Sequence, residues 1–405
     1  MRALRGSILA AACAGLLTAP VHAIDEEHAG RGRAAAAKAA EFLRSKQDVA
    51  TGGWSVPATV EGQPRPPVMP AISALALNGL LLKGESIRDP ALARGVSFVL
   101  SLRQPDGGIY DRVLPSYNTA ISLSMLARVG SPEAGAAIRP AQDFVRAGQW
   151  WEGAGPGVGA EVPGKVGADH PFYGGVGYGK HSRPDLSNLA FMLQALHDSG
   201  VPADDAAFTR ARIFLARVQM VDAVNDMPYA DGTRQGGFIY ATGPEGDQPG
   251  VGQSFAGSID ETLDDGTTVS RLRAYGSMTY AGFKSLIYAG LKKDDPRVVA
   301  ATGWIARNYT LEENPGLGTD GMYYYYLMFA RAMDARAEPT LNVITPDGAA
   351  TERDWANDLI DRLVSLQQAD GSFRVVDDRW MENDGVLIAS YALIALGHAL
   401  GGGAN

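Results

Sequence analysis

Two kinds of apolar helix pattern alternate along the chain. In the first kind, an aromatic residue or Leu precedes an aliphatic residue, and Gln follows after three more positions. Copies occur at Phe42-Leu43-Gln47, Phe144-Val145-Gln149, Phe214-Leu215-Gln219 and Leu363-Val364 with Gln367 or Gln368; the copy ending at Gln104 is looser, and Trp304-Ile305 is followed by Tyr309 instead of Gln. Six copies indicate an internal repeat.

A Gly-containing loop and a second helix pattern, rich in Ala, Ser, Leu and Tyr, follow each copy. These second patterns cover residues 71–82, 119–129, 186–199, 278–290, 322–334 and 386–400. They are apolar on nearly every face, which is typical of buried helices, whereas the first helix of each pair carries charge on one side. We therefore predict an all-α fold, a closed (α/α)6 toroid of six helical hairpins with outer and inner helices alternating. An open solenoid is the alternative, but neither end helix has the polar face of a cap.

The best-ordered loop is the turn Pro105-Asp106-Gly107-Gly108, which is followed by Tyr110. Pro fits the first turn position, and Gly fits positions where φ is positive. Because the turn recurs in sibling form near residue 370, we interpret Gln104 and Asp106 as residues that tie loops, not as catalytic groups.

Three irregular segments interrupt the repeat, at residues 150–184, 221–275 and 337–351. Long loops in a compact domain are often lids or binding loops. Alternation over residues 237–242 predicts a small β-hairpin over one mouth of the ring. Function is therefore expected where the repeats are interrupted, above all before Asp185 and before Tyr275.

The first residues have the pattern of an export signal. Arg2 and Arg5 precede an apolar run, and Val21-His22-Ala23 offers small residues for cleavage. We expect residues 1–23 to be a signal peptide, 24–32 a flexible N-terminus, 33–400 a single toroid domain and 401–405 a disordered tail. The protein is then exported, to the periplasm or the medium; lipid anchoring through Cys13 is the alternative.

Composition narrows the chemistry. The single Cys is Cys13, so a cleaved chain has no thiol for a disulfide, a Cys-ligated metal or a nucleophile. Four later histidines, His170, His181, His197 and His398, have no metal-binding spacing. A net charge of −9 without a basic stripe argues against nucleic acid as a partner. We expect no cofactor, no metal and no transmembrane segment.

The repeats resemble those of squalene and other triterpene cyclases and of protein prenyltransferase β subunits. The likeness rests on Gln104-Pro-Asp-Gly-Gly-Ile-Tyr110 and Gln367-Gln-Ala-Asp-Gly-Ser-Phe373. It implies a toroid whose inner helices line a central cavity, with ligand entry at the loops that join outer to inner helices. The chain also resembles exported bacterial repeat proteins of unassigned role.

The catalytic motifs of these families are only partly present. Triterpene cyclases protonate their substrate with an Asp of an Asp-x-Asp-Asp motif, and this chain has Thr262-Leu263-Asp264-Asp265. The zinc-binding Cys of prenyltransferases is missing. Asp264 and Asp265 are the candidate general acids, since a carboxyl kept neutral by burial or a like charge can donate a proton. The alternative is a solvated acidic turn.

Polar and aromatic residues at the starts of the inner helices are expected to surround the cavity. Helix capping by Asp and Asn, and core packing by the aromatic residues, are the alternatives. The candidates are Tyr117, Asn118, Asp185, Asn188, Tyr275, Tyr280, Asp320, Tyr323, Tyr324, Trp380 and Asp384.

Three functions are compatible with this pattern. One is an enzyme that binds a small apolar, isoprenoid-type ligand and transforms it by acid-initiated chemistry. The second is a non-catalytic toroid that binds a ligand or a protein, and the third is a polysaccharide lyase or hydrolase. The sequence identifies no protein partner.

Overall fold

The inner and outer helices of the structure form two concentric rings. The computed structural model describes residues 24–58, 60, 62–154, 164–243, 249–263 and 265–402. The outer helices are α1 (Glu26–Ser45), α3 (Pro90–Ser101), α5 (Pro132–Ala147), α7 (Ala206–Val218), α9 (Pro296–Arg307) and α11 (Trp355–Leu366). The inner helices are α2 (Pro70–Leu82), α4 (Pro115–Leu126), α6 (Leu186–Asp198), α8 (Gly276–Tyr288), α10 (Met322–Arg336) and α12 (Gly385–Ala399).

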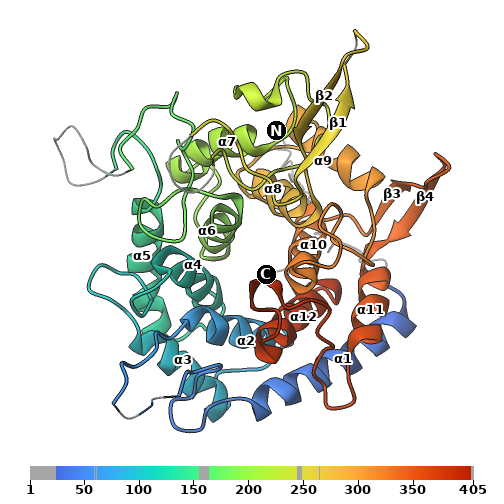
Figure 1. Ribbon diagram of the computed structural model, residues 1–405. Coiled ribbons are helices and arrows are strands. Elements are labelled where there is room, and N and C mark those ends of the chain that lie inside the picture. The colour runs from blue at the N-terminus through green and yellow to red at the C-terminus, as the bar shows by residue number, and fades with distance from the viewer. Residues whose placement is uncertain are drawn as a thin grey trace, which may run out of the picture.

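The inner ring is closed. Each inner helix packs against the next, from α2 through α4, α6, α8 and α10 to α12, and α12 returns to α2 (Figure 1). In α12 every residue from Val386 to Ala399 is buried. Such helices are apolar all round because the ring covers one side and the outer helices cover the other. The predicted toroid is confirmed.

Local sequence signals begin the outer helices. In α3, α5 and α9 a Pro occupies the first helical turn directly after Asp89, Ser131 or Asp295, whose side chain accepts a backbone N–H of that turn. Pro has no N–H to leave unpaired there, and the cap satisfies one of the free donors.

In four of the six repeats, the repeated Gln joins one hairpin to the next. Gln149 Nε2 donates to the carbonyl of Gly174 in its own loop (2.8 Å) and to that of Ala207 at the start of α7 (3.0 Å). We call this pair of bonds the glutamine clamp. It recurs from Gln47 to Gly52 and Ala91, from Gln219 to Gly236 and Arg297, and from Gln367 to Gly371 and Ala35. The last clamp joins the final hairpin to α1 and so closes the ring.

In each clamp, the loop glycine also contacts the outer helix to which the Gln side chain of that clamp is bonded. A Cβ on Gly174 would lie 2.1 Å from the carbonyl oxygen of Arg210, and one on Gly371 would lie 2.2 Å from that of Lys38. Both glycines also have positive φ, 81° and 85°. No other residue fits this close approach of two backbones.

Two copies of the repeat do not form the clamp, and these are the two copies whose sequences differ from the pattern. Gln104, with its looser spacing, donates to Tyr110 (2.7 Å) and Leu102 (3.3 Å) in its own segment. Tyr309, which replaces Gln, reaches the following outer helix by donating its hydroxyl to Asp358 (2.7 Å). The interpretation of Gln104 as a structural residue agrees with these contacts.

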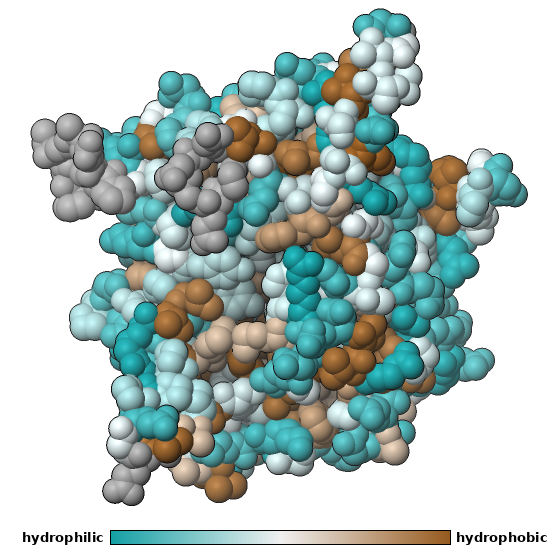
Figure 2. Space-filling view, in the orientation of Figure 1, coloured by the Kyte–Doolittle hydropathy of each residue, from teal (hydrophilic) through white to brown (hydrophobic). Residues whose placement is uncertain are grey.

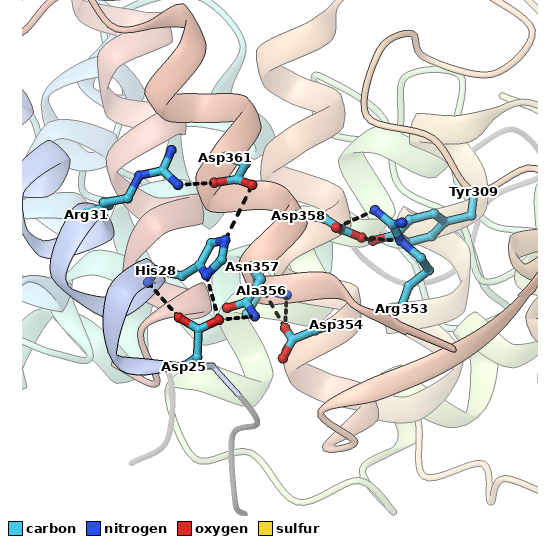
Figure 3. A network of polar contacts seen from close by, with 10 residues as sticks. All are labelled: Asp25, His28, Arg31, Tyr309, Arg353, Asp354, Ala356, Asn357, Asp358 and Asp361. Atoms are coloured by element: carbon cyan, nitrogen blue, oxygen red, sulfur yellow. Dashed lines mark hydrogen bonds and ion pairs between the residues drawn. The ribbon is translucent and has the colours of Figure 1, made fainter. Parts of the chain in front are cut away.

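Polar contacts reinforce the closure between the first and last outer helices. His28 of α1 lies between the carboxyls of Asp25 (2.7 Å) and Asp361 (3.4 Å), and Arg31 pairs with Asp361 (2.7 Å) (Figure 3). Asn357 also donates to Asp25. Within the segment 24–32, which the sequence predicts as a flexible N-terminus, α1 begins at Glu26; Asp25 caps this helix, and α11 packs against it.

In the part of the chain that the structure describes, the strands form two antiparallel hairpins outside the rings. In the first, β1 (Ser258–Thr262) pairs with β2 (Thr268–Leu272), with Ser258 opposite Leu272. In the second, β3 (Thr340–Ile344) pairs with β4 (Ala350–Asp354), with Thr340 opposite Asp354. Both project from the body beyond α9 and α11 (Figure 1).

The predicted hairpin at residues 237–242 is wrong in its position. Phe238 to Ala241 are buried, and the segment makes isolated bridges to Gln219 and Gln253. These residues are apolar because the loop packs into the ring. A hairpin with one face in solvent would instead alternate apolar and polar residues. The predicted signal peptide with Cys13, and residues 403–405 of the predicted tail, lie outside the described residues. Within the described ranges, no helix is long and apolar enough to cross a bilayer.

Replacing Gln149 by Leu tests the clamp. The change leaves two buried carbonyls and the Arg210 Nε–H, which donates to Gln149 (2.7 Å), without their partner. We expect the free energy of unfolding, measured by urea denaturation, to fall by about 3 kcal/mol, because each unsatisfied buried group costs about 1–3 kcal/mol. Gln63→Leu, at an exposed Gln, is the control, and equal stability of the two variants would contradict the clamp.

Candidate functional site

The candidate site is a cavity of about 300 Å³ at the N-terminal ends of the inner helices. All six inner helices contribute to its wall, and loop residues complete it. The lining residues are Met69, Ala71, Ile72, Leu75, Leu114, Tyr117, Tyr178, Ser187, Tyr240, Phe255, Tyr275, Ser277, Met278, Tyr324, Trp380, Met381, Glu382, Leu387 and Tyr391. Figure 2 shows a hollow near the centre of this view, with hydrophilic residues over much of the periphery.

Aromatic rings form much of the wall. Tyr117 meets Tyr178 with 5.8 Å between ring centroids, and Tyr240 meets Phe255 at 4.6 Å. Phe255 in turn meets Trp380 at 5.7 Å. The loops therefore extend the aromatic lining of the inner helices toward the mouth.

Three tyrosine hydroxyls of the wall have hydrogen-bond partners on other inner helices. The hydroxyls of Tyr324 and Ser187 are 2.9 Å apart, and those of Tyr117 and Tyr391 are 3.4 Å apart. These pairs join α10 to α6 and α4 to α12 across the ring. Because these three hydroxyls are occupied, this part of the wall presents mainly rings and aliphatic groups to a ligand.

Among the described residues that line the cavity, Glu382 is the one with a carboxyl group. Its side chain accepts backbone N–H groups from Tyr323 (3.0 Å) and Tyr324 (2.8 Å), in the first turn of α10. It is 1% exposed. Burial raises its pKa to about 7, although the backbone donors at the helix N-terminus act in the opposite direction.

A strained turn holds Glu382 in place. It directly follows the short helix η2 (Arg379–Met381), in which Trp380 and Met381 have left-handed φ angles of 55° and 67°. This conformation costs free energy for residues other than glycine, so it persists only where the surrounding structure imposes it. The same turn brings Trp380 and Met381 to the cavity mouth, where both stay partly exposed.

Asp185 is a second buried carboxyl close to the wall. It caps α6 by accepting the backbone N–H (2.9 Å) and the side-chain amide (2.8 Å) of Asn188. Burial raises its pKa to about 6. Unlike Glu382, Asp185 is not among the residues that line the cavity.

The sequence prediction of a general acid at Asp264 and Asp265 does not fit the described structure. Asp265 lies in the exposed turn between β1 and β2 and accepts the backbone N–H of Thr267 (2.9 Å), which lowers its pKa. An exposed carboxyl with a lowered pKa stays ionised, so Asp265 has the character of the solvated acidic turn. Asp264 lies outside the described residues.

Four of the predicted cavity residues line the cavity: Tyr117, Tyr275, Tyr324 and Trp380. The other predicted residues have structural contacts. Asn118 bonds Ala71 and Val113, Tyr280 packs against Tyr325 and Phe329, Asp320 pairs with Arg379, Tyr323 donates to the Arg374 carbonyl, and Asp384 caps α12, while Asn188 binds Asp185 as described. For these the capping and packing alternatives describe the contacts.

Sequence reasoning missed Tyr178, Tyr240, Phe255 and Glu382. The first three lie in the two long interruptions that were expected to carry function, so their aromatic character was the available signal. Glu382 had no signal, because a Glu next to Asn383 and Asp384 resembles any polar helix start.

Among the residues that the structure describes, no three His, Cys, Asp or Glu side chains gather in a way that would hold a metal ion.

No protein-family model matches the sequence, and no curated protein matches it. Similar solved structures exist. One is a variant of the type II terpene cyclase MstE from Scytonema in complex with geranylgeranyl dihydroxybenzoate, with 13% identity, a TM-score of 0.52, and coverage of 94% of this chain and 100% of that one.

Another is an inactive variant of an α-1,6-mannanase of glycoside hydrolase family 76 from Salegentibacter, in complex with α-1,6-mannotriose. It shares 10% identity with a TM-score of 0.53 and covers 91% of this chain and 99% of that one. The chain has the toroid fold of both classes. At these identities the likeness concerns the fold alone.

Glu382→Gln tests the environment of the buried carboxyl. Folding raises the pKa of Glu382 from 4.5 to about 7, so the folded state holds a proton that the unfolded state loses. The free energy of unfolding should therefore fall by about 3 kcal/mol in total as pH rises from about 4.5 to about 7. Above about pH 7 it should stay constant. Glu382→Gln should lack this part of the pH dependence, measured by urea denaturation at several pH values.

The control is Glu313→Gln, at an exposed Glu, which should keep the wild-type profile. An identical pH profile for wild type and Glu382→Gln would show that Glu382 is solvated.

Proposed function

We propose that the cavity binds a small apolar, isoprenoid-type ligand and that Glu382 transfers a proton to it. The observation that carries the proposal is a single buried carboxyl in an otherwise apolar, aromatic wall. A cavity of about 300 Å³ lies at the lower end of the range of small-molecule sites. A ligand there would be held mainly by burial of apolar surface.

The surroundings of Glu382 suit a proton donor. Burial keeps the carboxyl protonated near neutral pH, where its pKa of about 7 makes the proton available. The N–H groups of Tyr323 and Tyr324 already point at the oxygens, so they stabilise the carboxylate that remains after transfer.

The proposed step is the addition of a proton to a carbon–carbon double bond. The π electrons form the new C–H bond, Glu382 becomes a carboxylate, and the ligand becomes a carbocation. Loss of a proton from a neighbouring carbon to water gives a neutral isomer or cyclised product, and water returns a proton to Glu382. The aromatic rings of Tyr324, Tyr391 and Trp380 are part of the wall, and their π faces would attract the cation.

A glycosidase is the second candidate. Two carboxyls with raised pKa, Glu382 and Asp185, lie near one cavity, and glycoside hydrolysis uses two. This function requires Asp185 to release Asn188 and turn toward the ligand. A non-catalytic binding toroid, the remaining class, needs only the apolar wall.

The proposal includes export. The signal-peptide pattern of residues 1–23 would place the protein in the periplasm or the medium, or on a membrane if Cys13 is lipidated. The ligand would then be met outside the cytoplasm. Protein fractionation with detection of the mature N-terminus tests this part.

Incubation in heavy water with linear isoprenoid alcohols of 15 and 20 carbons tests the chemistry. A deuteron delivered by Glu382 stays on carbon, so mass spectrometry should find products one mass unit heavier. Glu382→Gln should lower the rate at least about 100-fold, as loss of a general acid does, while Glu313→Gln retains it. Label incorporation that survives Glu382→Gln would contradict the role of Glu382.

The same preparations should be offered α-1,6-linked mannan oligosaccharides. Hydrolysis that depends on both Glu382 and Asp185 would favour the glycosidase. Binding of the isoprenoid alcohols without any turnover would leave a binding toroid, and absence of binding would overturn the proposed ligand class.

A further inference from the structure

Each inner helix carries a buried polar side chain seven residues after a residue that lines the cavity. Seven residues are about two helical turns, so both side chains lie on the same face, about 10 Å apart along the helix. We call this second layer the polar belt. It consists of Asn78, Ser124, Gln194, Lys284, Arg331 and His398, which follow the lining residues Ala71, Tyr117, Ser187, Ser277, Tyr324 and Tyr391.

The belt is buried, with no member more than 4% exposed. It lies deeper in the ring than the apolar cavity, toward the C-terminal ends of the inner helices. Apolar residues such as Ile121 and Met328 stand between the two layers on their helices. The belt is therefore a separate feature from the candidate site.

Hydrogen bonds connect part of the belt to Asp198 at the end of α6. Lys284 Nζ donates to Gln194 Oε1 (2.9 Å), and Gln194 Nε2 donates to Asp198 Oδ1 (2.8 Å). The hydroxyl of Ser124 also donates to Asp198. On the other side, the ring of His398 is 2.7 Å from a carboxyl oxygen of Asp334.

Arg331 lies among groups from several inner helices. Its electrostatic neighbours are Asp198 of α6, Tyr288 of α8, Tyr391 of α12 and Arg128, which follows α4. Nevertheless its buried Nε and Nη1 atoms have no hydrogen-bond partner in the described structure, and neither has Nε of Arg128. A buried guanidinium with unpaired N–H donors is unfavourable unless something accepts them.

The charged groups of this region are the guanidiniums of Arg128 and Arg331 and the carboxyls of Asp198 and Asp334. Lys284 is fully buried, which lowers its pKa well below the usual value and favours its neutral form. Guanidinium groups bind carboxylate and phosphate oxygens through paired N–H donors.

We propose that the polar belt is a binding site for a small oxyanion, a carboxylate or a phosphate, which accepts the free N–H donors of Arg331 and Arg128. Access is from the end of the ring opposite the apolar cavity, where Arg128 is half-buried and His197 is exposed. The site is independent of the proposed function, because neither the apolar cavity nor Glu382 takes part in it.

Thermal unfolding with inorganic phosphate, at constant ionic strength, tests the proposal. A ligand that binds only the folded protein raises the melting temperature as its concentration rises. We expect this increase in the wild type and in Arg336→Gln, which removes a mostly buried Arg elsewhere on α10. Arg331→Met should lower the phosphate affinity at least about tenfold, because it removes charge-assisted hydrogen bonds.

The variants also separate binding from a structural role. Without phosphate, Arg331→Met should be about as stable as the wild type, because buried N–H donors without acceptors are removed while Arg128 still faces Asp198. A large loss of stability without phosphate, or the same phosphate effect in all three proteins, would overturn the proposal.

Calorimetric titration of the wild type keeps the proposal testable if Arg331→Met does not fold. Phosphate and acetate serve as the two probes, one for each kind of oxyanion. Saturable binding of at least one of them, at one site per chain, supports the belt as an oxyanion site, and no saturable binding of either overturns it.

Discussion

The hydrogen bonds of the glutamine clamp are the constraint on which the structure depends. One side-chain amide holds a loop carbonyl and a carbonyl of the next outer helix together, as Gln149 does for Gly174 and Ala207. The spacing between neighbouring hairpins is thereby fixed by backbone contact. Four of the six copies use this device, and the one from Gln367 to Ala35 joins the two ends of the chain. A ring results because the last interface resembles the others.

The closed ring explains both polar features of its interior. Six inner helices with their N-termini at one end surround a space that the loops narrow to an aromatic cavity. Glu382 enters that space from a strained turn and binds the first turn of α10, so a helix N-terminus stabilises the charge that burial opposes. At the other end, the same helices bury the side chains of the polar belt, Arg331 among them. The ring therefore separates a buried carboxyl from a layer of other buried polar groups.

The sequence predicted the parts that repeat and missed the parts that do not. The inner helices were predicted to within a few residues because burial on all sides leaves a continuous apolar run. The clamp leaves a recurring Gln in the sequence, since its contacts use the same positions in four of the six copies. Tyr178, Tyr240 and Phe255 have no sibling copies, and their places depend on how two long loops fold over the ring.

The candidate general acid shows most clearly what a sequence pattern does not predict. Asp265 matched half of a known motif, but a hairpin turn exposes it to water. Glu382 matched nothing, yet the left-handed turn at Trp380 and Met381 buries it. Burial of a single carboxyl is a tertiary property, and a local pattern does not encode it. The acidic run and the buried acid could be told apart only in the folded chain.

The central claim is that a neutral carboxylic acid lies in the cavity at near-neutral pH. The infrared difference spectrum between wild type and Glu382→Gln measures it directly. The account predicts a band of a protonated carboxyl at about pH 6 that is lost by about pH 8. Absence of that band at about pH 6, with only a carboxylate signal, would contradict the account.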